Sequence, residues 1–93
     1  MRIEWSARAL VDLDRFALFL EGQYPQLAKI VAAEIIDKAQ VLLRHPQLGR
    51  LIYDRDEYRE VMLQVLNATY IFRYAYDGER LVMPRVFHSR EAR

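Results

Sequence analysis

Apolar and polar residues alternate through most of the second half of the chain. Within residues 58–76 apolar side chains recur at every second position, and many of them are β-branched or aromatic. The recurring positions are Val61, Leu63, Val65, Tyr70, Phe72, Tyr74 and Tyr76. This pattern is typical of strands with one buried face. Because Asp-Gly between two alternating runs favours a tight hairpin, we predict a two-residue turn at Asp77-Gly78 and a further strand after it.

A two-residue turn fixes the register of this hairpin, because Tyr76 must then lie opposite Glu79. The further pairs are Tyr74 with Leu81, Phe72 with Met83, Tyr70 with Arg85 and Arg73 with Val82. One face then carries the apolar residues Tyr70, Phe72, Tyr74, Leu81, Met83 and Phe87. The other face, which can stay open, is mixed and carries Thr69, Ile71, Arg73, Ala75, Val82, Pro84, Val86 and His88. Since proline cannot donate to a ladder, Pro84 predicts either an unpaired side or a bulge in the last strand.

The first half of the chain shows helical spacing. Residues 2–5 predict a short strand, and Ser6 follows where a helix N-cap is favoured. The apolar residues of the next stretch are Leu10, Leu13, Phe16, Ala17 and Leu20, and the polar side is left to Arg8, Asp12 and Arg15. This helix is expected to stop near Gly22, and Pro25 opens a second helix that runs to about Arg44. So short a break requires the two helices to lie antiparallel, as a helical hairpin.

Proline and glycine predict a loop from His45 to Arg50. We expect the charged run at residues 54–57 to lie in a solvated loop. The order of elements is then β-α-α-β-β-β, which predicts an α+β fold with the helical hairpin packed on one face of a small, mainly antiparallel sheet. With 93 residues the chain has room for one core, so we expect a single domain over residues 1–93.

Composition excludes several classes of function. The absence of cysteine excludes a disulfide framework, a thiolate zinc site and thiol catalysis. Since no carboxylate stands at ligand spacing to either histidine, we expect no metal and no cofactor. There is no run of 18 apolar residues and no signal-peptide pattern at the start, so a cytoplasmic protein without membrane contact is expected. The net charge of +1 gives no argument for nucleic acid. Residues 80–93 are nevertheless locally basic, with Arg80, Arg85, Arg90 and Arg93.

Several motifs stand in an order that is informative as a set. They are A-L-x-D-L at residues 9–13, the helix start Tyr24-Pro25, H-P-x-x-G-R at residues 45–50, and R-V-x-H-x-R at residues 85–90. In their order and spacing the motifs resemble the ParE-like toxins of bacterial type II toxin–antitoxin modules, within the RelE/ParE superfamily. Arg73, at a position that is usually apolar, and Pro84, in a strand that is usually uninterrupted, depart from that pattern.

The resemblance implies a compact toxin that a small cognate antitoxin, encoded beside it, neutralises in a heterotetramer or larger hetero-oligomer. It implies contact with DNA only through the antitoxin. ParE-like members are associated with poisoning DNA gyrase, whereas RelE-like relatives cut messenger RNA on the ribosome. The leading expectation is therefore a non-enzymatic gyrase inhibitor. An endoribonuclease and a non-toxic domain that binds its antitoxin and represses their shared promoter remain alternatives.

Candidate site residues follow from these alternatives. Arginine suits carboxylates and phosphates, so the residues predicted to bind the target are Arg85, His88 and Arg90. An RNA-cleaving toxin needs cations beside the scissile phosphate and an acid–base group, for which the candidates are Arg59, Arg73, Arg85 and His88. In the predicted register Arg73 and His88 share one face, whereas Tyr70 and Arg85 share the other. The ribonuclease set therefore does not converge, and no catalytic residue is expected in the leading reading.

The first helix carries more apolar surface than one stripe requires. Its excess residues, together with the aromatic residue of the following break, are Phe16, Phe19, Leu20 and Tyr24. An apolar patch that the core does not need usually marks a binding surface. We predict that an amphipathic helix of the antitoxin binds there. The alternative is that Phe19, which falls off the line from Leu13 to Leu20, packs on the second helix.

Overall fold

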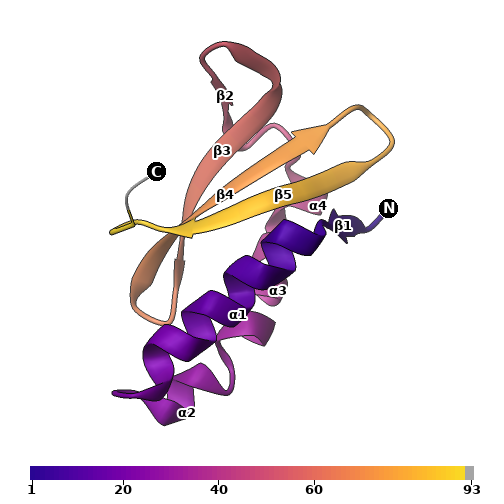
Figure 1. Ribbon diagram of the computed structural model, residues 1–93. Coiled ribbons are helices and arrows are strands. Elements are labelled where there is room, and N and C mark those ends of the chain that lie inside the picture. Colours follow the sequence, from indigo (N-terminus) through magenta and orange to yellow (C-terminus); the bar gives the residue numbers. More distant parts are fainter. Residues whose placement is uncertain (92–93) are drawn as a thin grey trace.

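Helices cover one face of a five-stranded sheet in the computed structural model, which describes residues 1–91 (Figure 1). In chain order the elements are β1 (Ile3–Trp5), α1 (Ala7–Glu21), α2 (Pro25–Ala28), α3 (Val31–Ala39), α4 (Val41–Arg44), β2 (Arg50–Ile52), β3 (Arg55–Val65), β4 (Ala68–Tyr76) and β5 (Leu81–His88). The strand order is β1-β5-β4-β3-β2, antiparallel except for β1 with β5. The predicted α+β layout is therefore confirmed. The last two residues of the expected domain, Ala92 and Arg93, lie outside the described residues.

Helix α1 begins and ends close to its predicted limits. The Ser6 hydroxyl accepts the backbone N–H of Ala9 at 3.0 Å, the bond expected of an N-cap. The same hydroxyl donates to the carbonyl of Pro84 at 2.9 Å. Gly22 follows the last helical residue, Glu21. The cap thus starts the helix and also fixes its first turn against β5.

The second predicted helix is divided into α2, α3 and α4, so the single helix expected from Pro25 onwards is wrong. The backbone N–H of Ile30 bonds to the carbonyl of Leu27, and that of Gln40 to the carbonyl of Asp37, both at 3.1 Å. These three-residue steps tighten the turn and bend the segment. The bends keep the apolar side of the segment against the sheet, and its fully buried residues are Val31, Ile35, Ala39 and Leu42.

The hairpin between β4 and β5 differs from the prediction in both turn and register. Tyr76 pairs with Leu81, so residues 77–80 form a four-residue connection instead of a two-residue turn. The Asp77 carboxylate accepts two backbone N–H groups of this connection, at 2.9 and 2.8 Å, and Gly78 has a φ of +98°. Aspartate therefore stabilises the wider loop through its side chain. The observed pairs are Tyr76–Leu81, Ala75–Val82, Arg73–Arg85, Phe72–Val86, Ile71–Phe87 and Tyr70–His88.

Pro84 lies at a bulge, one of the two outcomes predicted for it. Ala75 pairs with Val82 whereas Arg73 pairs with Arg85, so two residues of β5 oppose a single residue of β4. An inserted residue moves every later side chain to the opposite face, because side chains alternate with period two. Proline is suited to the bulge, since no ladder bond requires an N–H there.

The bulge explains why the predicted faces are wrong beyond Pro84. Val86, expected on the open face, is fully buried in the core, and Phe87, expected on the covered face, lies on the open one. There the guanidinium carbon of Arg85 lies 4.6 Å from the centroid of the Phe87 ring, and that of Arg73 lies 5.2 Å from it. The two guanidinium groups cover the ring on the sheet face opposite the helices.

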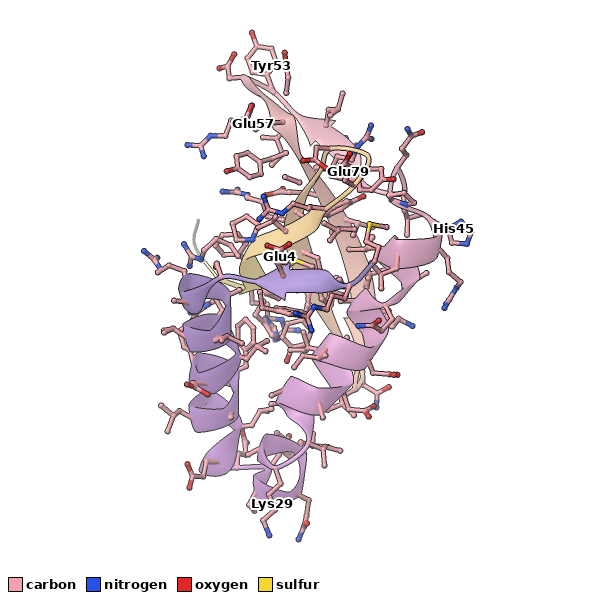
Figure 2. All side chains as sticks on the ribbon, turned by 90° about the vertical axis from the view of Figure 1, so that its right-hand side faces the viewer. Glu4, Lys29, His45, Tyr53, Glu57 and Glu79 are labelled. Atoms are coloured by element: carbon pink, nitrogen blue, oxygen red, sulfur yellow. The ribbon has the colours of Figure 1, made fainter. Side chains whose placement is uncertain are left out.

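Residues 50–57 contribute more of the sheet than the sequence predicts. Strand β2 is an additional strand, and β3 already begins at Arg55, so the charged run expected in a loop belongs largely to a strand. The side chains of residues 54–57 remain exposed. Asp54 adopts a φ of +70° in the turn, and Tyr53 stands at the tip of the projecting β2–β3 hairpin (Figure 2). Exposed charge thus does not prevent strand pairing here, because β2 pairs with the start of β3, with Ile52 opposite Arg55.

The loop after α4 is anchored by Tyr74, which is fully buried. The Tyr74 hydroxyl donates to the carbonyl of Pro46 and accepts the backbone N–H of Gly49, both at 2.8 Å. Arg59 donates to the carbonyl of Gly49 at 2.7 Å. A Cβ at position 49 would lie 2.9 Å from the carbonyl oxygen of Glu60 and from the Tyr74 ring. The H-P-x-x-G-R motif is therefore needed for packing.

We expect Tyr74→Phe to lower the free energy of unfolding by about 1–3 kcal/mol. The change leaves the N–H of Gly49 and the carbonyl of Pro46 without their buried partner. Urea denaturation of the variant measures the loss. Tyr76→Phe is the matched control, because the Tyr76 hydroxyl makes only an exposed bond of 3.3 Å. Equal losses in the two variants would contradict the anchoring role.

Candidate protein-binding groove

A groove of about 730 Å³ runs along α1, between the β3–β4 hairpin and the C-terminal end of β5. Its volume lies in the usual range for binding clefts. The groove is lined by all the residues predicted to bind an antitoxin, Phe16, Phe19, Leu20 and Tyr24. It is also lined by two of the three residues predicted to bind the target, His88 and Arg90. The structure therefore brings two predicted surfaces together in one place.

The α1 wall of the groove combines packed and exposed rings. Phe16 is buried, and its ring meets that of Tyr70 edge to face, with centroids 5.0 Å apart. Phe19, one turn further along the helix, is 79% exposed, and Tyr24 is 53% exposed. Phe19 therefore does not pack on the second helix, which was the alternative reading. Exposed rings that rim a groove form an apolar surface of the kind that partners cover.

His88 extends the row of rings in the groove. It pairs with Tyr70 across β4 and β5, and the two ring centroids are 5.1 Å apart. Its Nδ1 atom accepts the backbone N–H of Arg90 at 3.1 Å, so the neutral ring carries its proton on Nε2. The prediction that His88 shares a face with Arg73 is wrong, because the bulge at Pro84 turns it towards Tyr70.

The end of the groove nearest the chain terminus is charged, and Arg15 is its centre. Arg15 donates through Nε and Nη2 to the two carboxylate oxygens of Glu91, at 2.9 and 3.0 Å. Its Nη1 atom donates to Asp12 at 2.6 Å. Arg85 donates to the same aspartate at 2.9 and 3.1 Å. Two arginines and two carboxylates thus form one continuous chain of ion pairs between α1 and β5.

Asp12 is the member of this network whose burial and ion pairing sequence reasoning missed. The helical pattern placed it on the polar side of α1, yet it is fully buried. Strand β1 pairs with residues 81–83 of β5, and within residues 1–91 no strand lies beside the edge-facing N–H groups beyond the bulge. Asp12 accepts the N–H of Val86 at 2.9 Å, and Glu91 accepts that of His88 at 2.7 Å. The available signal was an aspartate set between leucines in the A-L-x-D-L motif.

Asp12 and Glu91 are both held in the ionised state. For each, burial acts to raise the pKa, but hydrogen bonds from arginine and from the backbone outweigh it. The pKa of Asp12 therefore lies below its ordinary value of 3.8, through bonds from Arg85, Arg15 and the N–H of Val86. The pKa of Glu91 lies below 4.5, through bonds from Arg15 and the N–H of His88. The groove end keeps its charges at neutral pH.

This network predicts a loss of stability in acid. A carboxyl group whose pKa is lower in the folded protein than in the unfolded chain stabilises the fold at any pH above its unfolded pKa. This stabilisation is lost as the pH falls through the folded pKa. We therefore expect the free energy of unfolding, measured in urea, to be constant near neutrality and to fall below about pH 4. Asp12→Asn should make this fall shallower. An equally steep fall in the variant would contradict the assignment.

The four ribonuclease candidates do not form one site. Arg73 and Arg85 are cross-strand partners on the open face. Arg59 and His88 belong to the helix-covered face, since they pair with Tyr74 and Tyr70. Those two tyrosines are four residues apart along β4, a separation of about 13 Å. The set therefore spans both faces of the sheet.

The candidate arginines of the open face also have carboxylate partners. Arg73 bonds to Glu60 at 2.8 and 2.6 Å, and Arg85 bonds to Asp12. Among residues 1–91, no group of three or more histidine, aspartate and glutamate side chains is placed to hold a metal ion, and no helix is long and apolar enough to cross a membrane. Arg73 and Arg85 are thus both engaged in ion pairs within the chain.

Comparisons with known proteins agree with this fold. Residues 3–93 match the family model described as the ParE toxin of the type II toxin–antitoxin system parDE. Among solved structures, a chain of the chromosomal ParDE TA system from P. aeruginosa is similar, with a TM-score of 0.75, 18% identity and 95% of each chain covered. The conserved hypothetical protein HP0894 from Helicobacter pylori is similar with a TM-score of 0.55 and 13% identity, over 98% of this chain and 97% of that one.

The two kinds of comparison carry different weight. At identities of 18% and 13%, the two solved structures show a shared fold. The comparison with curated proteins returned no significant match. The family model, by contrast, extends over nearly the whole chain. The chain therefore belongs to the ParE toxin family of type II toxin–antitoxin systems.

Proposed function

We propose that this chain is a cytoplasmic toxin that inhibits DNA gyrase by binding it and is held inactive by a cognate antitoxin. The observation that carries the antitoxin part is the groove along α1. Phe19 and Tyr24 are exposed at its rim although they are large and aromatic. Such rings are the usual anchors of protein interfaces. Their place beside a preformed groove supports a protein partner.

The partner that fits this groove is an amphipathic helix. Helix α1 forms one long wall, and an antiparallel or crossing helix would pack its apolar side chains between Phe19 and Leu20 on that wall and the β3–β4 hairpin. The half-buried Arg15 and the exposed Arg90 lie at one end, where the polar face of such a helix meets solvent. We propose that the antitoxin supplies this helix, in a heterotetramer or larger assembly.

The target is proposed to share part of the same surface. Arg90 and His88 line the groove, whereas the Arg85 guanidinium is bonded to Asp12 and stacked on Phe87. An antitoxin helix in the groove would cover Arg90 and His88, and would thereby block a target that uses them. Of the three target candidates, Arg90 is the most exposed and is the best placed to make a new contact.

The test is induced expression of the chain without antitoxin, followed in the same cells by plasmid topology and messenger RNA integrity. The expected result is growth arrest with altered supercoiling and intact transcripts, reversed when the antitoxin is co-expressed. Rapid transcript cleavage would overturn the gyrase proposal and favour a RelE-like ribonuclease. Soluble protein without any arrest would favour a non-toxic domain that only binds antitoxin and represses their promoter.

A further inference from the structure

Glu91 closes the charged end of the groove from within the same chain. Among the described residues that line the groove, it is the one acid, whereas Arg15 and Arg90 are bases. Its carboxylate takes both free donors of the Arg15 fork and also the N–H of His88. Without Glu91 this end of the groove would present two arginines and an unpaired backbone N–H. This end of the groove therefore has the donors of a carboxylate-binding site, and the carboxylate that occupies it is Glu91 of the same chain.

The two acids of this network are held very differently. Asp12 is part of α1 and is fully buried, so it cannot leave its arginines while the helix is folded. Glu91 follows β5 in a short turn, whose backbone bond is that from the Glu91 N–H to the carbonyl of His88, at 3.0 Å. Its side chain is 30% exposed. The N–H of Arg90 also bonds to the His88 ring within this turn, at 3.1 Å. These two backbone N–H bonds of the turn are local to residues 88–91, so they can break without loss of a bond between strands.

Arg15 stays in position when Glu91 departs. Its Nη1 atom is bonded to the buried Asp12, and its guanidinium carbon lies 4.9 Å from the centroid of the Phe16 ring. These contacts keep Nε and Nη2 directed towards the groove. A bidentate carboxylate is the partner that such a fork recognises best.

We propose that a carboxylate of the bound antitoxin displaces Glu91 from Arg15 and accepts the N–H of His88 in its place. The proposal rests on the proposed function, since it assigns the acidic contact of the same groove. The exchange conserves the number of charged hydrogen bonds, so its main cost is the release of the turn at residues 88–91. Glu91 is thus an internal competitor that lowers antitoxin affinity and rejects helices without an acid at this end.

The geometry also places the displacing acid along the antitoxin helix. Arg15 and Phe19 are four residues apart on α1, which is about 6 Å along the helix axis. A helix lying along α1 would then carry its acid three or four residues from the apolar side chain that packs on Phe19. This spacing distinguishes a partner for this groove from an amphipathic helix chosen at random.

Glu91→Gln tests the proposal with purified antitoxin and the full chain. Glutamine keeps an acceptor for the N–H of His88 but removes the ion pair. We expect the antitoxin to bind about fivefold more tightly, because the closed groove no longer competes. Binding to the variant should also weaken more steeply with added salt than binding to the unchanged chain. In the variant, binding adds an ion pair with Arg15, whereas in the unchanged chain it replaces the existing pair with Glu91.

Glu4→Gln is the matched control. Glu4, on β1 (Figure 2), forms an equally bidentate pair with Arg80, at 2.9 and 2.6 Å, outside the groove. This variant should leave antitoxin affinity and its salt dependence unchanged. Unchanged or weaker binding by Glu91→Gln would overturn the displacement of Glu91. So would a structure of the complex in which Glu91 is still bonded to Arg15, which decides the matter if the variant folds poorly.

Phe19→Asp separates this inference from the proposed function. Loss of binding in Phe19→Asp, together with no gain in Glu91→Gln, would keep the groove as the antitoxin site and reject the exchange of carboxylates. Normal binding by Phe19→Asp would instead reject the groove itself. Loss in Phe19→Asp with a gain in Glu91→Gln supports both.

Discussion

Asp12→Asn is expected to lower the free energy of unfolding by about 3 kcal/mol, a large part of the stability of a domain of this size. The carboxylate is fully buried and accepts bonds from Arg15, Arg85 and the N–H of Val86. The amide cannot accept from all of them, and its own NH₂ group would face donors. Two positive charges and an edge N–H would then lose their common partner.

Urea denaturation at neutral pH measures this effect. Asp14→Asn is the control, because Asp14 lies on the same helix and is exposed, so its change should stay within about 0.5 kcal/mol. Similar losses for the two variants would show that the effect arises from helical charge and not from the buried network. A lowered affinity for antitoxin in Asp12→Asn would follow from the same cause, since Arg15 loses its inner support.

Phe19→Asp is expected to weaken antitoxin binding by about 100-fold, or about 3 kcal/mol, without loss of stability. Phe19 is 79% exposed in the unbound chain, so its replacement removes little from the folded core. In the proposed complex the ring would be buried, and an aspartate there would leave a charge in an apolar contact. Titration calorimetry and thermal unfolding together measure the two effects.

Leu18→Asp is the matched control for this substitution. Leu18 is the neighbouring residue on α1 and is 70% exposed, but it does not line the groove. We expect its affinity for antitoxin to change by less than about threefold. If Leu18→Asp weakened binding as strongly as Phe19→Asp, the antitoxin would lie on the outer side of α1, and the groove would lose its assigned role.

Local sequence determined the elements whose causes are local. Ser6 begins α1, because an N-cap hydroxyl acts within a few residues of its position. The alternation up to Tyr76 correctly identified the covered face of β4, because successive side chains of a strand point to opposite faces whichever strand lies beside it. The motif order likewise carried the family resemblance. The four apolar residues predicted on and after α1 do line one groove, because they are neighbours on a single helix and its following turn.

Only the tertiary structure decided features that depend on one inserted residue or on distant partners. The bulge at Pro84 reverses the face of everything after it, so Phe87 and His88 fell on sides that alternation could not predict. Helical spacing placed Asp12 on the polar side of its helix. In the fold it is buried, and its charge is paired with Arg85, which lies 73 residues further along the chain. The groove exists because the end of β5 returns beside α1. Strand register and ion pairing are set by long-range contacts, and local patterns in the sequence do not encode them.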